Sequence, residues 1–98
     1  MSPKFSKRVA ALAAARAIEN GQQVALMVPT EVLATQHLET FTRWFEPLGI
    51  TCVLCVGRRG RKQRALLADG SAQLGIGTQA LIQDGITFAR LGLVIVNE

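Results

Sequence analysis

The 98-residue sequence contains no apolar run long enough to cross a membrane. Stretches such as LGLVIV at residues 91–96 have the length of a strand, whereas a membrane helix needs about 18 apolar residues. The basic, Ala-rich N-terminus is interrupted by Arg16 and Glu19, which argues against a signal peptide. Because 49% of the residues are apolar and 18% charged, a disordered tail is also excluded, and we expect residues 1–98 to form one domain.

Cysteine and histidine are scarce. Cys52 and Cys55 have C-x-x-C spacing, but no second Cys pair or nearby His completes a zinc site, so we expect no metal. In an extended segment these thiols point to opposite faces, about 10 Å apart and beyond disulfide reach. Two buried thiols in a reducing cytosol are predicted, and with them a cytoplasmic location. His37 is the sole histidine, and no base or nucleophile is identifiable beside it.

Acidic residues are fewer than basic ones, and the net charge of +4 suggests an anionic partner. Nine of the 11 basic residues form two groups: Lys4, Lys7, Arg8 and Arg16 in one, and Arg58, Arg59, Arg61, Lys62 and Arg64 in the other. Two interpretations stay open: solvated basic faces, or contacts to phosphate groups.

Apolar periodicity and breaker residues predict alternating helices and strands. Helices are expected at 7–19, from a cap at Thr30 to Glu46, and at 64–69; strands are expected at 23–28, 50–56, 74–78 and 93–96. This order of buried strands predicts a three-layer α/β fold with a parallel sheet. Ligands of such sheets collect beyond the carboxyl ends of the strands. Four polar segments follow strands in this way: Pro29–Glu31, Gly57–Lys62, Gly77–Gln79 and Asn97–Glu98.

Four stretches together resemble one family: KRVAALAAARAIENG, VALMVPTEVLATQH, FTRWFEPLGI and LGIGTQALIQDGITFARLGLVIVNE. They resemble the first motor domain of RecG-type ATP-dependent DNA helicases of superfamily 2. The match runs from just after the phosphate-binding loop to the first half of the Walker B motif. The resemblance implies a partial RecA-like, P-loop NTPase domain, DNA as the candidate partner, and a relation to DNA repair and recombination.

The departures from this family concern the nucleotide site. In the matching segment SPKFSKR, Lys7 stands at the family's lysine position, but no glycine precedes it and Arg8 replaces the metal-binding hydroxyl. Family members read D-E after the last strand, where the Asp serves Mg²⁺; this chain reads Asn97-Glu98, and an amide is a weaker ligand for a hard cation. We therefore expect Lys7, Asn97 and Glu98 to be remnants, with neither ATP nor Mg²⁺ used by this chain. Lys7 is then a solvent-facing residue at a helix start.

The resemblance also implies a nucleic-acid-binding rim. Its family-matched residues are Pro29, Thr30, Glu31, Gly77, Thr78 and Gln79. Arg58, Arg59 and Arg61 belong to a variable basic loop that suits phosphate contact. Thr30 also fits a helix N-cap, and the two roles can coexist. Trp44 and Phe45 are interpreted as core residues, not as a base-stacking platform.

Two functions remain open. The first is a nucleic-acid-binding module that neither hydrolyses ATP nor unwinds DNA alone; the second is an interaction or relic protein whose basic residues only solubilise it. An active ATPase would require a nucleotide site that these residues do not assemble. The strand LGLVIV is expected to form a bare apolar sheet edge, which predicts a homodimer or a partner protein.

Overall fold

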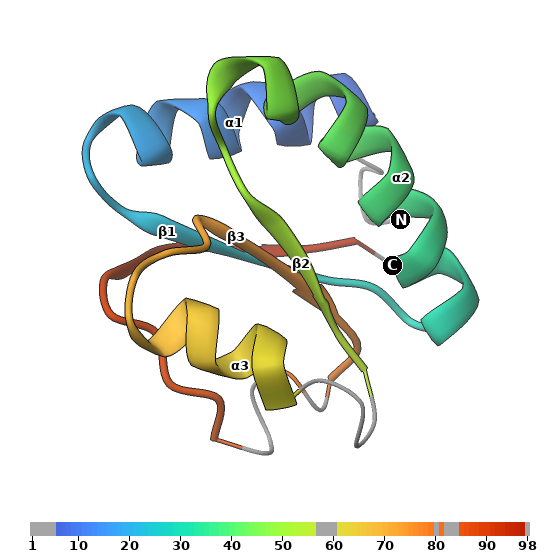
Figure 1. Ribbon diagram of the computed structural model, residues 1–98. Helices are drawn as coiled ribbons and strands as arrows, with labels where there is room; N and C mark the ends of the chain where they lie inside the picture. The colour runs from blue at the N-terminus through green and yellow to red at the C-terminus, as the bar shows by residue number, and fades with distance from the viewer. Residues whose placement is uncertain (1–5, 57–60, 80, 82–84, 98) are drawn as a thin grey trace.

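The computed structural model describes residues 6–56, 61–79, 81 and 85–97. Helices and strands alternate along the chain (Figure 1). Their bounds are α1 Lys7–Glu19, β1 Gln23–Met27, α2 Glu31–Phe45, a 3-10 helix Glu46–Leu48, β2 Cys52–Cys55, α3 Arg61–Ala68, β3 Leu74–Gly77 and β4 Leu91–Val96.

The first two helices begin at side-chain caps. The hydroxyl oxygens of Ser6 and Thr30 accept hydrogen bonds from the third residue after them, Val9 N at 3.2 Å and Leu33 N at 3.2 Å. Each cap satisfies a backbone donor that has no partner inside its helix. The chain leaves α2 through the 3-10 turn and then Gly49, whose φ of 76° is a conformation that favours glycine.

The described strands form a parallel sheet in the order β2-β3-β1-β4. β1 lies inside the sheet, with Val24 opposite Leu74 of β3 and Ala25 opposite Val94 of β4. β2 and β4 are the two edge strands of this sheet. Because every pair is parallel, the carboxyl ends of the strands lie at one rim of the molecule.

Helices cover both faces of the sheet. α1 and α2 lie on one face and α3 on the other (Figure 1). The first face is packed by small alanines of α1 and by aromatic rings of α2, with Val24, Leu26, Leu74 and Ile76 of the strands beneath them. The second face is packed around Leu67 of α3, with Ala25, Val53 and Cys55. The predicted three-layer α/β fold is confirmed.

The glycines of β3 allow neighbouring groups to approach closely. A Cβ atom at Gly75 would lie 2.8 Å from Cδ1 of Leu67, and one at Gly77 would lie 2.6 Å from the carbonyl oxygen of Cys55. Glycine is a poor strand former, so the predicted strand at 74–78 has weak local support. The structure instead shows a fully buried strand, because α3 and β2 fill the space that side chains would occupy.

Several boundaries differ from the expectations. α3 begins at Arg61, so Arg61 and Lys62 belong to a helix and not to the basic loop. β4 begins at Leu91, and β2 is shorter than predicted. Trp44 was expected in the core but is 37% exposed, whereas Phe45 is 3% exposed. Trp44 packs edge-on against Phe41, with ring centroids 5.7 Å apart, and its other side faces solvent.

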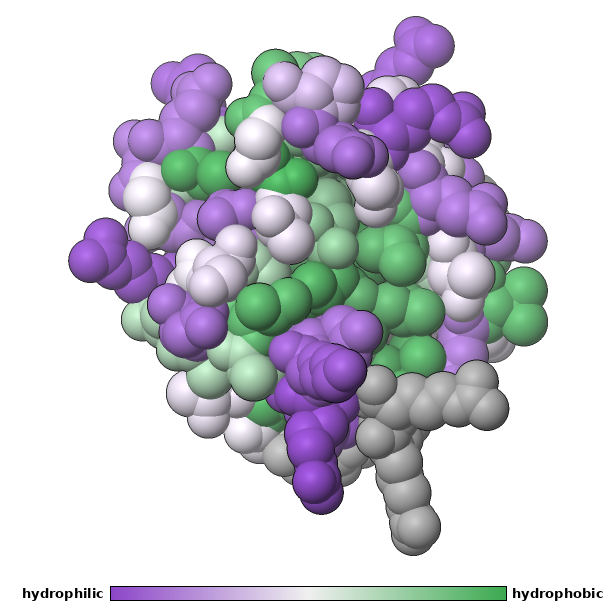
Figure 2. All heavy atoms as spheres, in the orientation of Figure 1, coloured by the Kyte–Doolittle hydropathy of each residue, from purple (hydrophilic) through white to green (hydrophobic). Residues whose placement is uncertain are grey.

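Apolar residues show across the middle of the face in Figure 2, in the region where β2 crosses the view, with polar residues of the helices around them. The side chains of β2 alternate between buried and half-buried, so this edge is partly covered. Among the described helices, none has the length and hydropathy required to span a membrane.

Candidate nucleic-acid interface

Hydrogen bonds bring three of the predicted segments together at the carboxyl rim. The N–H of Val28, just after β1, donates to the carbonyl of Gly77 at the end of β3, with an N···O distance of 2.9 Å. The N–H of Asn97, just after β4, donates to the carbonyl of Met27 at 2.8 Å. The segments 28–31, 77–79 and 97 are therefore neighbours, as the order of the strands requires.

Thr30 lies at the point where the chain turns from β1 into α2. Its backbone is extended, with φ −133° and ψ 155°, and its exposed hydroxyl accepts from Leu33 N. A hydroxyl that accepts one hydrogen bond still has its own hydrogen to donate. Pro29 and Glu31 on either side are also exposed. The predicted cap is confirmed, and Thr30 retains a donor for a ligand at the rim.

The second segment follows β3. Gly77 is buried, Thr78 is half-buried and Gln79 is exposed, so the chain emerges from the sheet across these three residues. The carbonyl of Thr78 accepts from Leu81 N at 2.9 Å, which turns the chain immediately after the rim. Thr78 therefore lies beside the Thr30 segment through the bond between Val28 and Gly77.

The third contribution is basic. Arg61 is exposed in the first turn of α3, which begins at the same end of the sheet (Figure 1). Together with Ala65 and Ala68 and the segment Gly85–Thr87, it lines a shallow cavity of about 340 Å³. Arg58, Arg59 and Glu98 lie outside the described residues. The structure therefore places one of the three predicted arginines.

His37 is the residue that sequence reasoning underestimated. The sequence identified no partner for it, yet it is only 5% exposed and packs edge-on to Phe41 with ring centroids 6.1 Å apart. The side-chain nitrogen of Asn97 lies 2.9 Å from Nε2 of His37. An amide nitrogen only donates, so Nε2 accepts and the ring proton lies on Nδ1.

The surroundings of His37 favour this neutral ring. Burial lowers the pKa of His37 below the usual 6.5, and the nearby positive charge of Lys7 lowers it further. The backbone of Leu33 raises the pKa, but by less than burial lowers it. Nδ1 is buried and makes no well-aligned hydrogen bond with any described residue. Lys7 and Asn97, which the sequence predicts to be remnants of a nucleotide site, thus both act on His37.

These residues do not fit the ATP and Mg²⁺ of the family. The amide of Asn97 is engaged with His37, and Arg8, at the position of the metal-binding hydroxyl, is exposed in the first turn of α1. The described residues contain no group of three His, Cys, Asp or Glu side chains placed to hold a metal ion. The amide of Asn97 and the basic side chains of Lys7 and Arg8 are poor ligands for a divalent cation.

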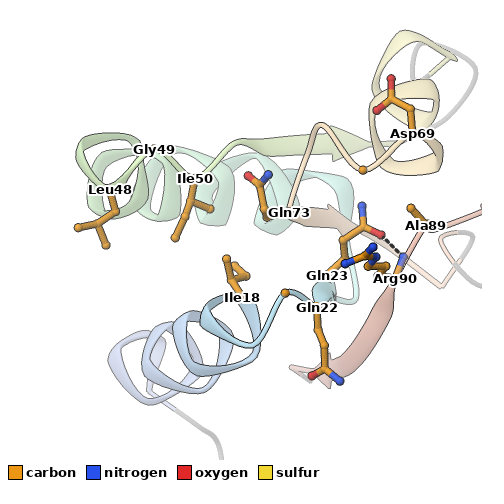
Figure 3. A pocket seen from close by; sticks show the side chains of 12 residues that line it. Ile18, Gln22, Gln23, Leu48, Gly49, Ile50, Asp69, Gln73, Ala89 and Arg90 are labelled. Carbon is orange, nitrogen blue, oxygen red and sulfur yellow. Dashed lines mark hydrogen bonds between the residues drawn. The ribbon is translucent and has the colours of Figure 1, made fainter.

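A larger cavity, of about 540 Å³, lies at the opposite, amino end of the sheet (Figure 3). One of its lining residues, Gln23, is 4% exposed; Nε2 donates to the carbonyls of Leu67 and Ala72 at 2.9 and 2.7 Å, and Oε1 accepts from Arg90 N at 2.7 Å. The amide is fully used in joining β1 to α3 and to the start of β4. This cavity is far from the predicted residues, and we do not assign the interface to it.

Comparison with known proteins identifies the family. Residues 8–98 match the DEAD/DEAH box helicase family. The ATP-dependent DNA helicase RecG of Haemophilus influenzae is 49% identical over 94 residues, and that of Escherichia coli K12 is 48% identical over 94 residues. RecG of Streptococcus pneumoniae is 47% identical over 92 residues. Each match covers 92% of this chain and 14% of the relative.

A solved structure agrees with the sequence relatives. RecG bound to a three-way DNA junction superposes on 89% of this chain with a TM-score of 0.80 and 36% identity, using 12% of the RecG chain. This chain therefore corresponds to a small part of the length of these relatives. It belongs to the DEAD/DEAH box helicase family and forms part of a RecG-type motor domain.

Proposed function

We propose that the carboxyl rim of this chain binds the backbone of DNA, and that the chain alone neither hydrolyses ATP nor unwinds DNA. The observation that carries the proposal is the pair of hydrogen bonds that set Pro29–Glu31, Gly77–Gln79 and Asn97 side by side. We propose the sugar–phosphate backbone as the ligand because the rim offers hydroxyls, a helix start and a cation.

The polar groups at the rim suit a phosphate oxygen. Thr30 retains a hydroxyl hydrogen after capping α2, and the first backbone N–H groups of a helix lack partners within it. Arg61 supplies a positive charge at the start of α3. The carboxylate of Glu31 lies in the same first turn of α2 and opposes binding, so we expect modest affinity that depends strongly on salt.

The proposed lack of ATPase activity follows from the residues at the nucleotide site. Asn97 donates to His37 and provides no carboxylate for a cation, and Arg8 provides no hydroxyl. Phosphate release from ATP should therefore stay at background with and without single-stranded DNA. A DNA-stimulated rate that disappears in Lys7→Ala would establish an active ATPase and refute this part of the proposal.

DNA binding is tested by fluorescence anisotropy of labelled single-stranded and forked DNA at several salt concentrations. Arg61→Ala and Thr30→Ala should each weaken binding about threefold or more, because each removes a donor to a phosphate oxygen. Arg61→Ala should also reduce the slope of log affinity against log salt by about 0.7 for each phosphate of single-stranded DNA that the arginine neutralises. Adding Arg58→Ala and Arg59→Ala should reduce it further.

Two matched variants control for charge and for helix composition. Arg16→Ala removes the same exposed charge from the last turn of α1, at the opposite rim, and Thr35→Ala removes an exposed α2 hydroxyl that donates to Glu31 O within the helix. Both should leave affinity within about twofold of the unchanged protein. Equal losses from Arg16→Ala and Arg61→Ala would show that only net charge matters.

A second candidate function, protein–protein interaction, is favoured by the edge strand β4. Leu91, Val94 and Val96 are 44%, 40% and 53% exposed, and the outer side of β4 has no neighbouring strand among the described residues. We propose that a strand of a second copy, or of a partner protein, pairs with this edge. The free thiols Cys52 and Cys55 support a reducing, cytoplasmic location for such a complex.

A further inference from the structure

The hydrogen bond between His37 and Asn97 connects α2 to a different element of the fold. The described side-chain hydrogen bonds of Thr30, Thr35 and Thr40 stay within α2 and its cap. The bond from His37 instead reaches Asn97, at the end of the edge strand β4. His37 is 5% exposed and Asn97 is half-buried, so the bond is partly shielded from water.

Asn97 is itself held from two sides. Its backbone N–H donates to Met27 of β1, and its side chain donates to His37. The residue after Met27, Val28, donates in turn to Gly77 of β3. A continuous path of hydrogen bonds therefore runs from the middle of α2, through Asn97 and the end of β1, to the segment that carries Thr78.

We propose that His37 and Asn97 are positioning residues that set the start of α2, and with it Thr30, relative to the Gly77–Gln79 segment. The inference rests on the proposed binding of DNA by this rim. His37 follows Thr30 by seven residues, about two helical turns or 10 Å along the axis. A shift of α2 at His37 moves the Thr30 hydroxyl, and hydrogen bonds weaken steeply with misalignment.

The amide of Asn97 acts as the donor in this pair, because its nitrogen lies 2.9 Å from Nε2 of His37. The bond ties the end of β4 to the helix that carries Thr30. Residue 97 in this chain thus serves the geometry of the rim instead of binding a cation.

The test combines DNA affinity with a double-mutant cycle. Asn97→Ala removes the donor, and it should weaken binding of a labelled single-stranded oligonucleotide about threefold or more. In the Thr30→Ala background the same change should have less than about a twofold effect, because the hydroxyl being positioned is gone. Thr40→Ala, which removes a hydrogen bond internal to α2, should leave affinity unchanged. Additive effects of Asn97→Ala and Thr30→Ala would overturn the proposal.

A second arm does not depend on DNA. Hydrogen exchange of the Leu33 and Ala34 amides, which donate to Thr30, should become faster in Asn97→Ala. The equivalent amides of Val9 and Ala10, which donate to the cap Ser6 of α1, should keep their rates. Equal acceleration at both helix starts would show a global loss of stability and would overturn the positioning role.

The two arms separate the proposals. If the unchanged protein fails to bind DNA at low salt, the proposed function fails, while the exchange rates still decide whether the hydrogen bond positions α2. His37→Phe serves as a second variant, since it keeps a ring against Phe41 but removes the acceptor. It should repeat the selective acceleration at Leu33 and Ala34, and unchanged rates in both variants would refute the inference.

Discussion

At the scale of single residues, two buried polar side chains join distant segments of the chain. Gln23 makes three hydrogen bonds to three separate segments, and His37 bonds across from α2 to Asn97. Neither partner set is visible in the sequence, because the partners are 44 to 67 residues away. Polar residues inside apolar patterns were the available signal, since buried polar groups require partners.

The opposite facing of the two cysteines was predicted correctly because strand alternation is a local rule, whereas of the two thiols expected to be buried Cys55 is buried and Cys52 is half-buried. Cys52 contributes to the face under α2 and Cys55 to the face under α3, and both thiols are free. Burial raises the pKa of Cys52 from 9.0 to about 11. Burial likewise raises the pKa of Cys55, an effect that Arg64 partly offsets.

This shift predicts slow thiol chemistry. At pH 8 the thiolate fraction of Cys52 should be about 100-fold lower than in the unfolded chain, so alkylation followed by peptide mass spectrometry should show slow modification unless urea is added. The raised pKa contributes stability below pH 9.0, and that contribution is lost as pH rises through about 11. Urea unfolding should therefore show that the free energy of unfolding falls less between pH 8 and pH 10 in Cys52→Ser than in the unchanged protein. Alkylation at the unfolded rate would contradict this.

At the scale of elements, α2 shows how far periodicity reaches. An apolar stripe of Ala34, Leu38, Phe41 and Phe45 recurs at helical spacing, and Ala34, Phe41 and Phe45 are buried. Trp44 lies beside that stripe on the helix surface. At such flanking positions the helical period of apolar residues does not show whether a side chain is buried or half-exposed. Only the width of the neighbouring sheet and of α1 decides how much of such a ring is covered.

Substitutions on α2 should reflect this difference. Phe41 is 2% exposed and packs against three rings, those of His37, Trp44 and Phe45. Phe41→Leu should lower the free energy of unfolding by about 1–2 kcal/mol, because a buried ring is replaced by a smaller side chain. Trp44→Leu, at a 37% exposed position, should cost at least about 0.5 kcal/mol less. Urea denaturation measures both, and equal costs would place Trp44 in the core after all.

At the scale of the whole molecule, the strand order decides which surfaces are open. β4 is an edge strand, and the apolar side chains of Val94 and Val96 point away from α1 and α2. They lie on the face of the sheet that carries α3, but they do not belong to the buried cluster around Leu67 of α3. Val9 and Leu12 of α1 are 49% and 72% exposed on the other face. The expectation of a bare apolar edge is confirmed, whereas the homodimer stays a prediction.

The exposed apolar edge strand β4 predicts self-association, and a charged side chain on this strand should suppress it. Light scattering coupled to gel filtration, over a range of concentrations, should show a dimer for the unchanged protein. Val94→Lys should shift it to the monomer, because a lysine on an edge strand opposes pairing. Val32→Lys places the same charge at a 67% exposed position on α2, away from the edge, and should leave the dimer intact. A monomer for the unchanged protein at all concentrations would refute the prediction.

The sequence by itself determined the element order, the fold class, the Thr30 cap and the family, because each follows from local periodicity, breaker residues or motif identity. It also predicted that Thr30 and Thr78 share one rim, since parallel strands end together. Only the tertiary structure decided the strand order, the burial of β3, the helical placement of Arg61 and the partnership of His37 with Asn97. Those features depend on packing between segments that are distant in sequence, and the local sequence of one segment does not identify the segment that packs against it.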